Sequence, residues 1–243
     1  MLLFVLLCLS AWPAQAITLL RDAEIERGLK VLSRDILLAA GLNPRSMRIF
    51  VVDDASLNAF AINSSAIFVH SGLITNLDRP EELQAVLAHE AAHIANGHLA
   101  RRAANFQATR TTAGLGIALG VLAAAASDNP QAGVGIALGS SSTAQRNFLA
   151  HTRAEESSAD QSAVRFLAQS GIDPKGAVDV LKRFLGQEVL NISRQDPYVR
   201  THPLSRDRMR AMEAFAVATK GSFKTNPQHA AWFNLIQGKI TAY

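Results

Sequence analysis

Residues 78–96 read Asp-Arg-Pro-Glu-Glu-Leu-Gln-Ala-Val-Leu-Ala-His-Glu-Ala-Ala-His-Ile-Ala-Asn, and this stretch decides how the rest of the chain is interpreted. Its apolar side chains recur at the spacing of a helix. Asp78 is the expected N-cap, Pro80 is tolerated in the first turn, and Glu81 has the spacing of a capping box. We therefore predict a helix that begins near Pro80 and either ends at Asn96-Gly97 or continues to Arg102.

The helix carries the motif His89-Glu90-Ala91-Ala92-His93. Two histidines four residues apart lie about 40° apart around a helix, so both imidazoles project toward one point, as a tetrahedral zinc ion requires. Glu90 lies about 100° from His89, where it can take a proton from zinc-bound water whose pKa the metal lowers toward about 7. Two ordinary surface histidines are the alternative, but the position of the motif in a capped helix favours a metal site.

A catalytic zinc site needs a third protein ligand. The extended motif HExxHxxGxxH would place glycine at position 96 and histidine at position 99, whereas the sequence has Asn96 and Leu99. His98 lies about 140° from His93 around a continuous helix, so we predict a surface or capping role for His98.

A carboxylate from a separate helix is the other source of a third ligand. The predicted helix over residues 153–169 contains Glu155 and Glu156, and spacing alone does not choose between them or exclude that both are solvated surface acids. Asp160 lies one turn after Glu156, and Arg153 lies about one turn before it. An acid at Asp160 could accept the far N–H of a zinc-bound histidine and fix its tautomer.

The remaining pattern predicts an α+β fold that is mostly helical, with a small β-sheet before the HExxH helix. The segment at 113–139 is Gly/Ala/Leu-rich with a polar interruption at 127–130, and it fits either a lid or membrane-dipping hairpin, or a buried helical hairpin. The expected strands are 48–52, 58–62 and 66–70, and the other expected helices are 22–40, 174–190, 203–216 and one that starts near 228.

The N-terminus predicts where the protein is located, and the composition argues against two classes of protein. Residues 2–9 are apolar and are followed by Ala14-Gln15-Ala16, which predicts a signal peptide over residues 1–16 and a single domain over 17–243; an uncleaved anchor or a buried helix is the alternative. The single cysteine, Cys8, excludes an intramolecular disulfide framework. A net charge of only +4, without a basic run, gives no support for nucleic-acid binding.

Three blocks follow one another along the chain: His89-Glu-Ala-Ala-His93, Arg153-x-x-Glu156-x-x-Ala159-Asp160 and Thr201-His202-Pro203-x-x-x-x-Arg208. Together they resemble the HtpX-like and BepA-like zinc metalloproteases of the gluzincin type, over roughly residues 20–215. The sequence lacks the long transmembrane helices of the HtpX-like members, which favours the periplasmic BepA-like branch. We expect no C-terminal tetratricopeptide repeats, for which the 243 residues leave no room.

The resemblance implies that His89, His93 and Glu156 bind one zinc ion per chain and that Glu90 is the general base. It ranks Glu156 above Glu155 as the ligand, because the glutamate of the second block is the ligand in the family.

The resemblance also suggests roles for residues around the metal. It supports the role of Asp160 beside a zinc-bound histidine, with Arg153 on the same helix as a further supporting residue. It places His202 near the open metal position, either as a stabiliser of the oxyanion or as a latch that occupies the fourth zinc site. Arg208 would hold that segment through a carboxylate.

These expectations combine into a zinc endopeptidase that cleaves extended segments of misfolded or misassembled envelope proteins. An edge strand containing Phe60, Ala61, Ile67 and Phe68 would pair with the substrate backbone. The expected location is the periplasm, with a candidate membrane-surface contact through residues 113–139. A chaperone-like client-binding protein with zinc latched by His202, and an inert truncated relative, are the competing hypotheses.

Overall fold

The computed structural model describes residues 18–101, 104, 111, 153–191, 194–219, 221 and 223–243. The predicted signal peptide at 1–16 and the apolar segment at 113–139 lie outside these residues. The described elements are β1 (Leu19–Leu20), α1 (Ala23–Ala39), β2 (Arg48–Val52), β3 (Ala59–Asn63), β4 (Ala66–His70), α2 (Ser71–Thr75), α3 (Pro80–Ala95), helices at 98–101 and 153–169, α6 (Lys175–Arg183), the 3-10 turn η1 (Gln187–Val189), α7 (Pro197–Thr201), α8 (Arg206–Ala218) and α9 (Pro227–Ala242).

The strands form one sheet in the order β1-β2-β4-β3. β2 and β4 pair in parallel, while β3 and β4 form an antiparallel hairpin. The expected strand bounds are correct to within one residue, and the two-residue strand β1 is an addition that the sequence pattern did not reveal. The α+β class is confirmed.

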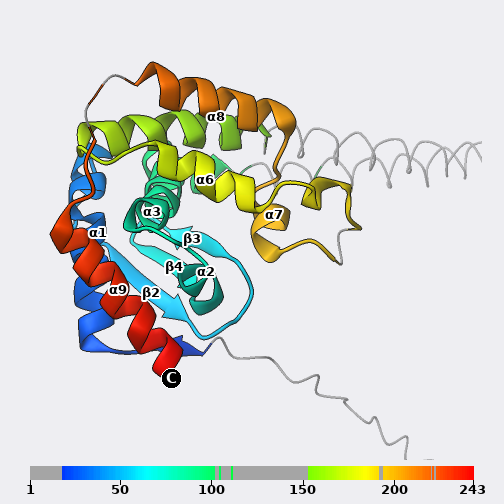
Figure 1. Cartoon of the computed structure of the whole chain (residues 1–243). Helices are drawn as coiled ribbons and strands as arrows, with labels where there is room; N and C mark the ends of the chain where they lie inside the picture. The colour runs from blue at the N-terminus through cyan, green and yellow to red at the C-terminus, as the bar shows by residue number, and fades with distance from the viewer. Residues whose placement is uncertain are drawn as a thin grey trace, which may run out of the picture.

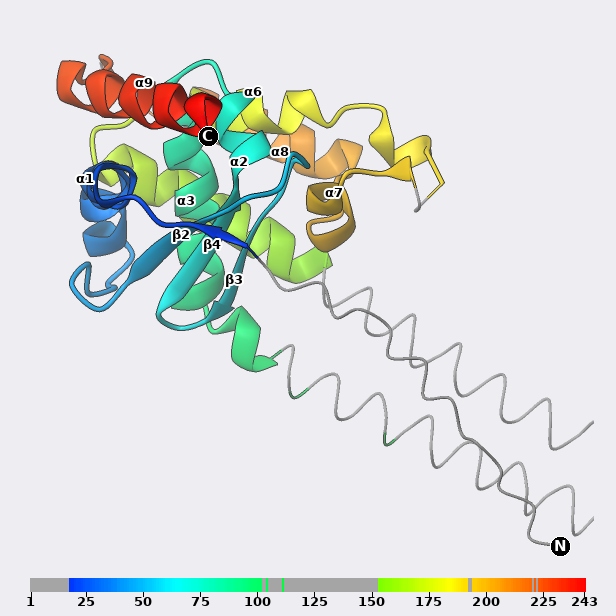
Figure 2. The same cartoon turned by 90° about the horizontal axis from the view of Figure 1, so that it is seen from below.

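Helix α3 occupies the centre of the molecule. Figure 1 shows it between the sheet on one side and a layer made by α6, α8 and the helix at 153–169 on the other, and α3 contacts β3, α1 and α6. Figure 2 shows α1 and α9 side by side, and these two helices pack against each other. Every residue of α3 from Pro80 to Ile94 is buried, because protein covers the helix on all sides. Its histidines therefore lie in the interior.

The start of α3 differs from the capping prediction. The N-cap is Arg79 rather than Asp78, and no side chain caps the helix. Instead, Glu82 accepts a hydrogen bond from the backbone N–H of Asp78, and Arg183 of α6 donates to the same carboxylate at 2.7 Å. The acid at the third helical position thus reaches back, and an ion pair from a neighbouring helix holds it there.

The C-terminal half departs further from the expected helices. The helix predicted over 174–190 ends at Arg183, because Gly186 turns the chain with a φ of 86° before η1. The short helix α7, which is not among the expected helices, begins at Pro197 with Asp196 as its N-cap residue. The basic helix begins at Arg206 with Ser205 as its cap rather than at Pro203. The last helix, α9, has Asn226 as its cap, close to the expected start.

The sheet topology narrows the predicted substrate-binding edge. β3 is an edge strand, so Phe60 and Ala61 lie where a further strand could add. Ile67 and Phe68 belong to β4, which has a partner on both sides, so the expectation that they lie on the edge is wrong. Ile67 is fully buried, and Phe68 stacks on Phe60 at a ring distance of 5.4 Å. Ile67 and Phe68 instead pair with Ala61 and Phe60 from the neighbouring strand.

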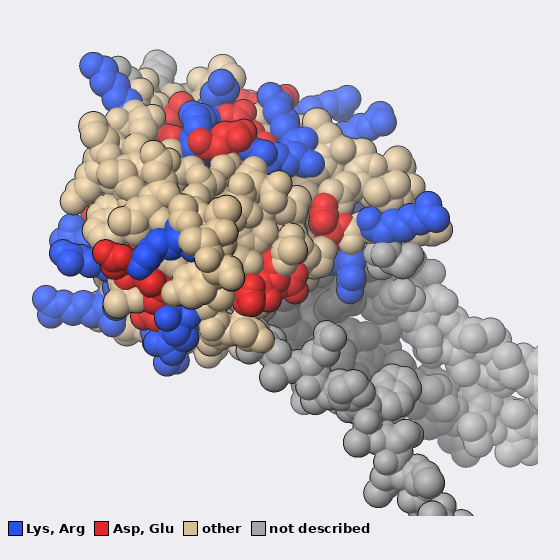
Figure 3. All heavy atoms as spheres, turned by 60° about the horizontal axis from the view of Figure 1, so that its bottom comes forward, with Lys and Arg blue, Asp and Glu red and all other residues tan. Residues whose placement is uncertain are grey.

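Helix length and surface charge describe how the protein could meet a membrane or a charged partner. Among the described helices, none is long and apolar enough to cross a membrane. On the face shown in Figure 3, basic and acidic side chains are interspersed over a surface that is mostly uncharged. This face therefore presents no extended area of a single charge.

Candidate metal centre

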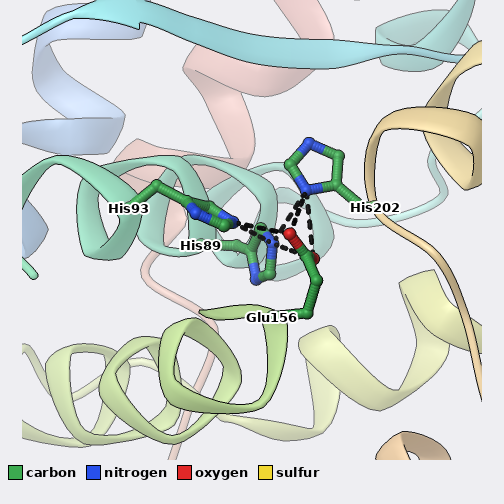
Figure 4. A group of neighbouring side chains, drawn as sticks. All are labelled: His89, His93, Glu156 and His202. Carbon is green, nitrogen blue, oxygen red and sulfur yellow. Dashed lines mark hydrogen bonds and ion pairs between the residues drawn. The ribbon is translucent and has the colours of Figure 1, made fainter. Parts of the chain in front are cut away.

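Four side chains from three parts of the chain converge in the interior. His89 and His93 come from α3, Glu156 from the helix at 153–169, and His202 directly follows α7. One ligand atom from each lies within 4.8 Å of all the others, and all four residues are buried. Figure 4 shows the four side chains pointing toward one another.

The ligand-atom distances that involve His89 or Glu156 suit a tetrahedral zinc ion. The Nε2 atoms of His89 and His93 are 3.0 Å apart, and each lies 3.2 Å from an oxygen of Glu156. His202 presents Nδ1, which is 3.3 Å from His89 Nε2 and 3.1 Å from Glu156 Oε2. Ligands about 2.05 Å from a tetrahedral zinc ion are about 3.3 Å from one another. Three imidazole nitrogens and one carboxylate are also a donor set that zinc favours.

A charged network holds this cluster from the side opposite the sheet. Asp160 Oδ1 lies 3.2 Å from His89 Nδ1, the nitrogen that faces away from the cluster. Arg208 donates two hydrogen bonds to Asp160, at 2.7 and 2.9 Å, and its Nη1 lies 3.2 Å from Glu156. The same guanidinium donates to the carbonyl of Pro203 at 2.8 Å, next to His202. One arginine therefore links two carboxylates to the segment that carries His202.

The electrostatics of the cluster suit a cation. Burial opposes the ionisation of Glu156, but contacts with His202, His89 and His93 hold its pKa well below its usual value. Burial would lower the pKa of His89, but hydrogen bonds to Asp160 and Glu156 raise it to about 10. Burial dominates for His93, whose pKa is well below its usual value. The carboxylate is thus ionised without metal, and a cation that binds His89 must displace a proton.

Glu90 lies beside the cluster and is not part of it. It is 1% exposed, and its Oε1 lies 3.3 Å from His202 Nε2. Within the part of the chain that the structure describes, this oxygen accepts no hydrogen bond. A buried carboxylate oxygen next to the metal position is arranged to accept a proton from a water molecule there.

Of the two adjacent glutamates, Glu156 is the one that belongs to the group of four donors. Glu156 is fully buried in the cluster, whereas Glu155 faces Arg101, whose Nε is 3.8 Å away. Arg153 is exposed and is the first described residue of the helix, and none of the described contacts joins it to the cluster. No described contact therefore supports the expectation that Arg153 stabilises the site.

His98 contradicts its predicted surface or capping role. It is fully buried, and its Nδ1 lies 3.0 Å from Nδ1 of His93. The angular argument assumed a continuous helix, but α3 ends at Ala95 and Gly97 turns the chain with a φ of 69°. The glycine after Asn96 was the signal for this turn, and it brings His98 back onto the end of α3.

Sequence reasoning also missed Tyr198 of α7. Its buried ring packs against His202 at 4.7 Å and stacks on Phe184 at 4.9 Å. The only available signal was a tyrosine four residues before His202, which indicates a shared face once α7 is known to be helical.

A helix that carries HExxH, joined by a glutamate from a later helix, defines a metalloprotease of the gluzincin type. The chain belongs to peptidase family M48, whose sequence model matches residues 20–216.

Three relatives illustrate the similarity. The chain is 30% identical to the beta-barrel assembly-enhancing protease of Escherichia coli (strain K12) over 196 residues, which cover 75% of this chain and 40% of the relative. It is 27% identical to the mitochondrial metalloendopeptidase OMA1 of Schizosaccharomyces pombe, covering 84% and 56% of the two chains. A protease HtpX homolog of Streptococcus equi is 49% identical over 53 residues, or 20% and 18% of the two chains. The aligned region therefore spans about two fifths of the assembly-enhancing relative.

Proposed function

We propose that the protein is a zinc-dependent endopeptidase that cleaves extended segments of misfolded or misassembled envelope proteins. The observation that carries this proposal is the buried group of His89, His93, Glu156 and His202, with the buried carboxylate of Glu90 beside it. Family membership and the relatives named as proteases support it. The name of the assembly-enhancing relatives suggests β-barrel outer-membrane proteins as the substrate class.

Each residue of the metal centre has a defined role in this proposal. Bound zinc supplies a Lewis acid for the scissile carbonyl and lowers the pKa of an adjacent water. His89, His93 and Glu156 hold the ion, and Asp160 orients His89 through its Nδ1. Glu90 accepts the proton of the attacking water and returns it to the leaving amine.

The edge strand β3 is the proposed binding surface for the substrate. An extended segment that pairs with β3 contributes backbone hydrogen bonds that do not depend on side chains, which suits unfolded substrates of varied sequence. The carbonyl of Ala59 in β3 is 3.3 Å from His202 Nε2. The strand that would bind substrate thus begins next to the metal ligands. The periplasmic location remains part of the proposal and rests on the predicted signal peptide.

The proposal predicts metal-dependent cleavage of an unfolded protein. The full chain, incubated with a denatured β-barrel outer-membrane protein, should produce fragments that appear on a gel, and a zinc chelator should stop cleavage. One equivalent of zinc should restore it, because the four donors form one site. Protection of the client from aggregation, without fragments at any zinc concentration, would instead support the chaperone-like alternative.

The position of His202 favours a latched resting state over an oxyanion-stabilising one. Its Nδ1 is a fourth donor beside His89 and Glu156, whereas a catalytic zinc site keeps its fourth position open. Its Nε2 faces Glu90 and Ala59 at 3.3 Å each. We propose that His202 withdraws before cleavage.

If His202 is a latch, replacing it by alanine should raise the rate of cleavage several-fold at saturating zinc, because the fourth position is then open. Initial rates with the unfolded substrate provide the measurement. His229→Ala, which removes a histidine of α9 outside the cluster, is the control and should leave the rate unchanged. A fall of about a hundredfold in His202→Ala would contradict the latch and assign His202 to the oxyanion.

A further inference from the structure

The two histidines of α3 each have one nitrogen that faces away from the cluster. For His89 this is Nδ1, which lies 3.2 Å from Asp160, as the sequence led us to expect. For His93 it is also Nδ1, which lies 3.0 Å from Nδ1 of His98, with the two rings nearly perpendicular at 73°. His98 thus contacts Nδ1 of His93 in the same way that Asp160 contacts Nδ1 of His89.

The chemistry of imidazole assigns the direction of the contact. When His93 Nε2 holds a metal ion, the single proton of its neutral ring is on Nδ1. The atom that faces it, Nδ1 of His98, can then only be an acceptor, so the ring proton of His98 is on its Nε2. A hydrogen bond of this kind fixes the tautomer and the orientation of a ligand ring.

The backbone places His98 for this contact. Gly97 adopts a φ of 69°, which is accessible to glycine at little cost, and a new helical turn begins at residue 98. His98 is not itself among the ligands, because its Nδ1 faces the far side of the His93 ring and it is outside the group of four donors.

We propose that His98 is a positioning residue of the metal centre, whose Nδ1 accepts the Nδ1–H of His93 and so holds the His93 ring in the orientation and tautomer that bind zinc. This inference rests on the proposed zinc site and assigns the partner of its second histidine. It gives both histidines of the motif an acceptor, one a carboxylate and the other an imidazole.

Two substitutions separate the acceptor role from simple packing. In His98→Asn, the side-chain oxygen can occupy the position of Nδ1, so the acceptor stays although volume is lost. In His98→Leu, the volume is largely kept and the acceptor is lost. The affinity for Zn²⁺ is measured on the full chain by competition with a chromophoric chelator at constant pH, and the visible spectrum of the Co²⁺-loaded protein reports the geometry of the ligands.

We expect His98→Leu to bind Zn²⁺ about 10- to 100-fold more weakly than the wild type and to alter the Co²⁺ spectrum. His98→Asn should remain within about threefold of the wild-type affinity, and His229→Leu should match the wild type. If packing alone mattered, the order of the two His98 variants would be reversed, and that result would overturn the inference. Equal affinities in both variants would also overturn it while leaving the zinc site intact. A wild type that does not bind Zn²⁺ would refute the proposed function as well.

Discussion

Replacing Glu90 by glutamine should lower the turnover of an unfolded protein substrate by roughly a hundredfold to ten-thousandfold without releasing zinc. Glutamine has the shape of glutamate but cannot accept the proton of the attacking water. Glu90 is excluded from the four donors, so the metal site should persist in the variant. kcat is measured with a denatured β-barrel protein, and the zinc content is measured in the same preparation.

Glu213→Gln is the control for this substitution, because Glu213 is a half-buried residue of α8 that pairs only with Lys182, at 3.4 Å, among the described contacts. It should retain full activity. If Glu90→Gln still cleaved at the wild-type rate, another group would be the base. If it lost its zinc, Glu90 would have to be reassigned as a ligand or as a residue on which the ligands depend.

The contrast between α3 and α7 shows which parts of the fold the sequence could predict. The pattern of α3 is long and periodic, and it carries a motif whose geometry follows from the helix itself, so His89, Glu90 and His93 could be placed before any tertiary contact was known. Helix α7 has five residues, and its only local signal, Asp196-Pro197, is as compatible with a break as with a helix start. Tyr198 therefore could not be connected with His202.

The errors at the site share a physical origin. His98 was placed by extending a regular helix through Gly97, and one left-handed residue invalidates that extension. Glu155 and Glu156 are adjacent, and spacing neither chooses between them nor excludes that both are surface acids, whereas in the fold Glu156 joins the group of donors. Asp78 lost its capping role because Glu82 and Arg183, which are 101 residues apart, form a tertiary ion pair at the start of α3. Contacts between distant segments cannot be read from local spacing.

Replacing Arg208 by methionine should lower the free energy of unfolding by about 3–5 kcal/mol, because it leaves the buried carboxylate of Asp160 without its arginine partner. Arg208 is 6% exposed, donates two hydrogen bonds to Asp160, and approaches Glu156 at 3.2 Å. Methionine fills much of the same volume, so the loss reports charge and hydrogen bonds rather than a cavity. The measurement is the urea midpoint and slope at saturating zinc.

The same helix provides the control for this prediction. Arg210 is exposed and its contact with Asp207 is 4.0 Å long, so Arg210→Met should change stability by less than about 0.5 kcal/mol. The double variant Arg208→Met with Asp160→Leu should recover part of the loss, because removing both partners of a buried pair costs less than removing one. If Arg208→Met were no more destabilising than Arg210→Met, the charges of Asp160 and Glu156 would have to be balanced by the histidines and the bound metal alone, and Arg208 would serve only to position His202 through the carbonyl of Pro203.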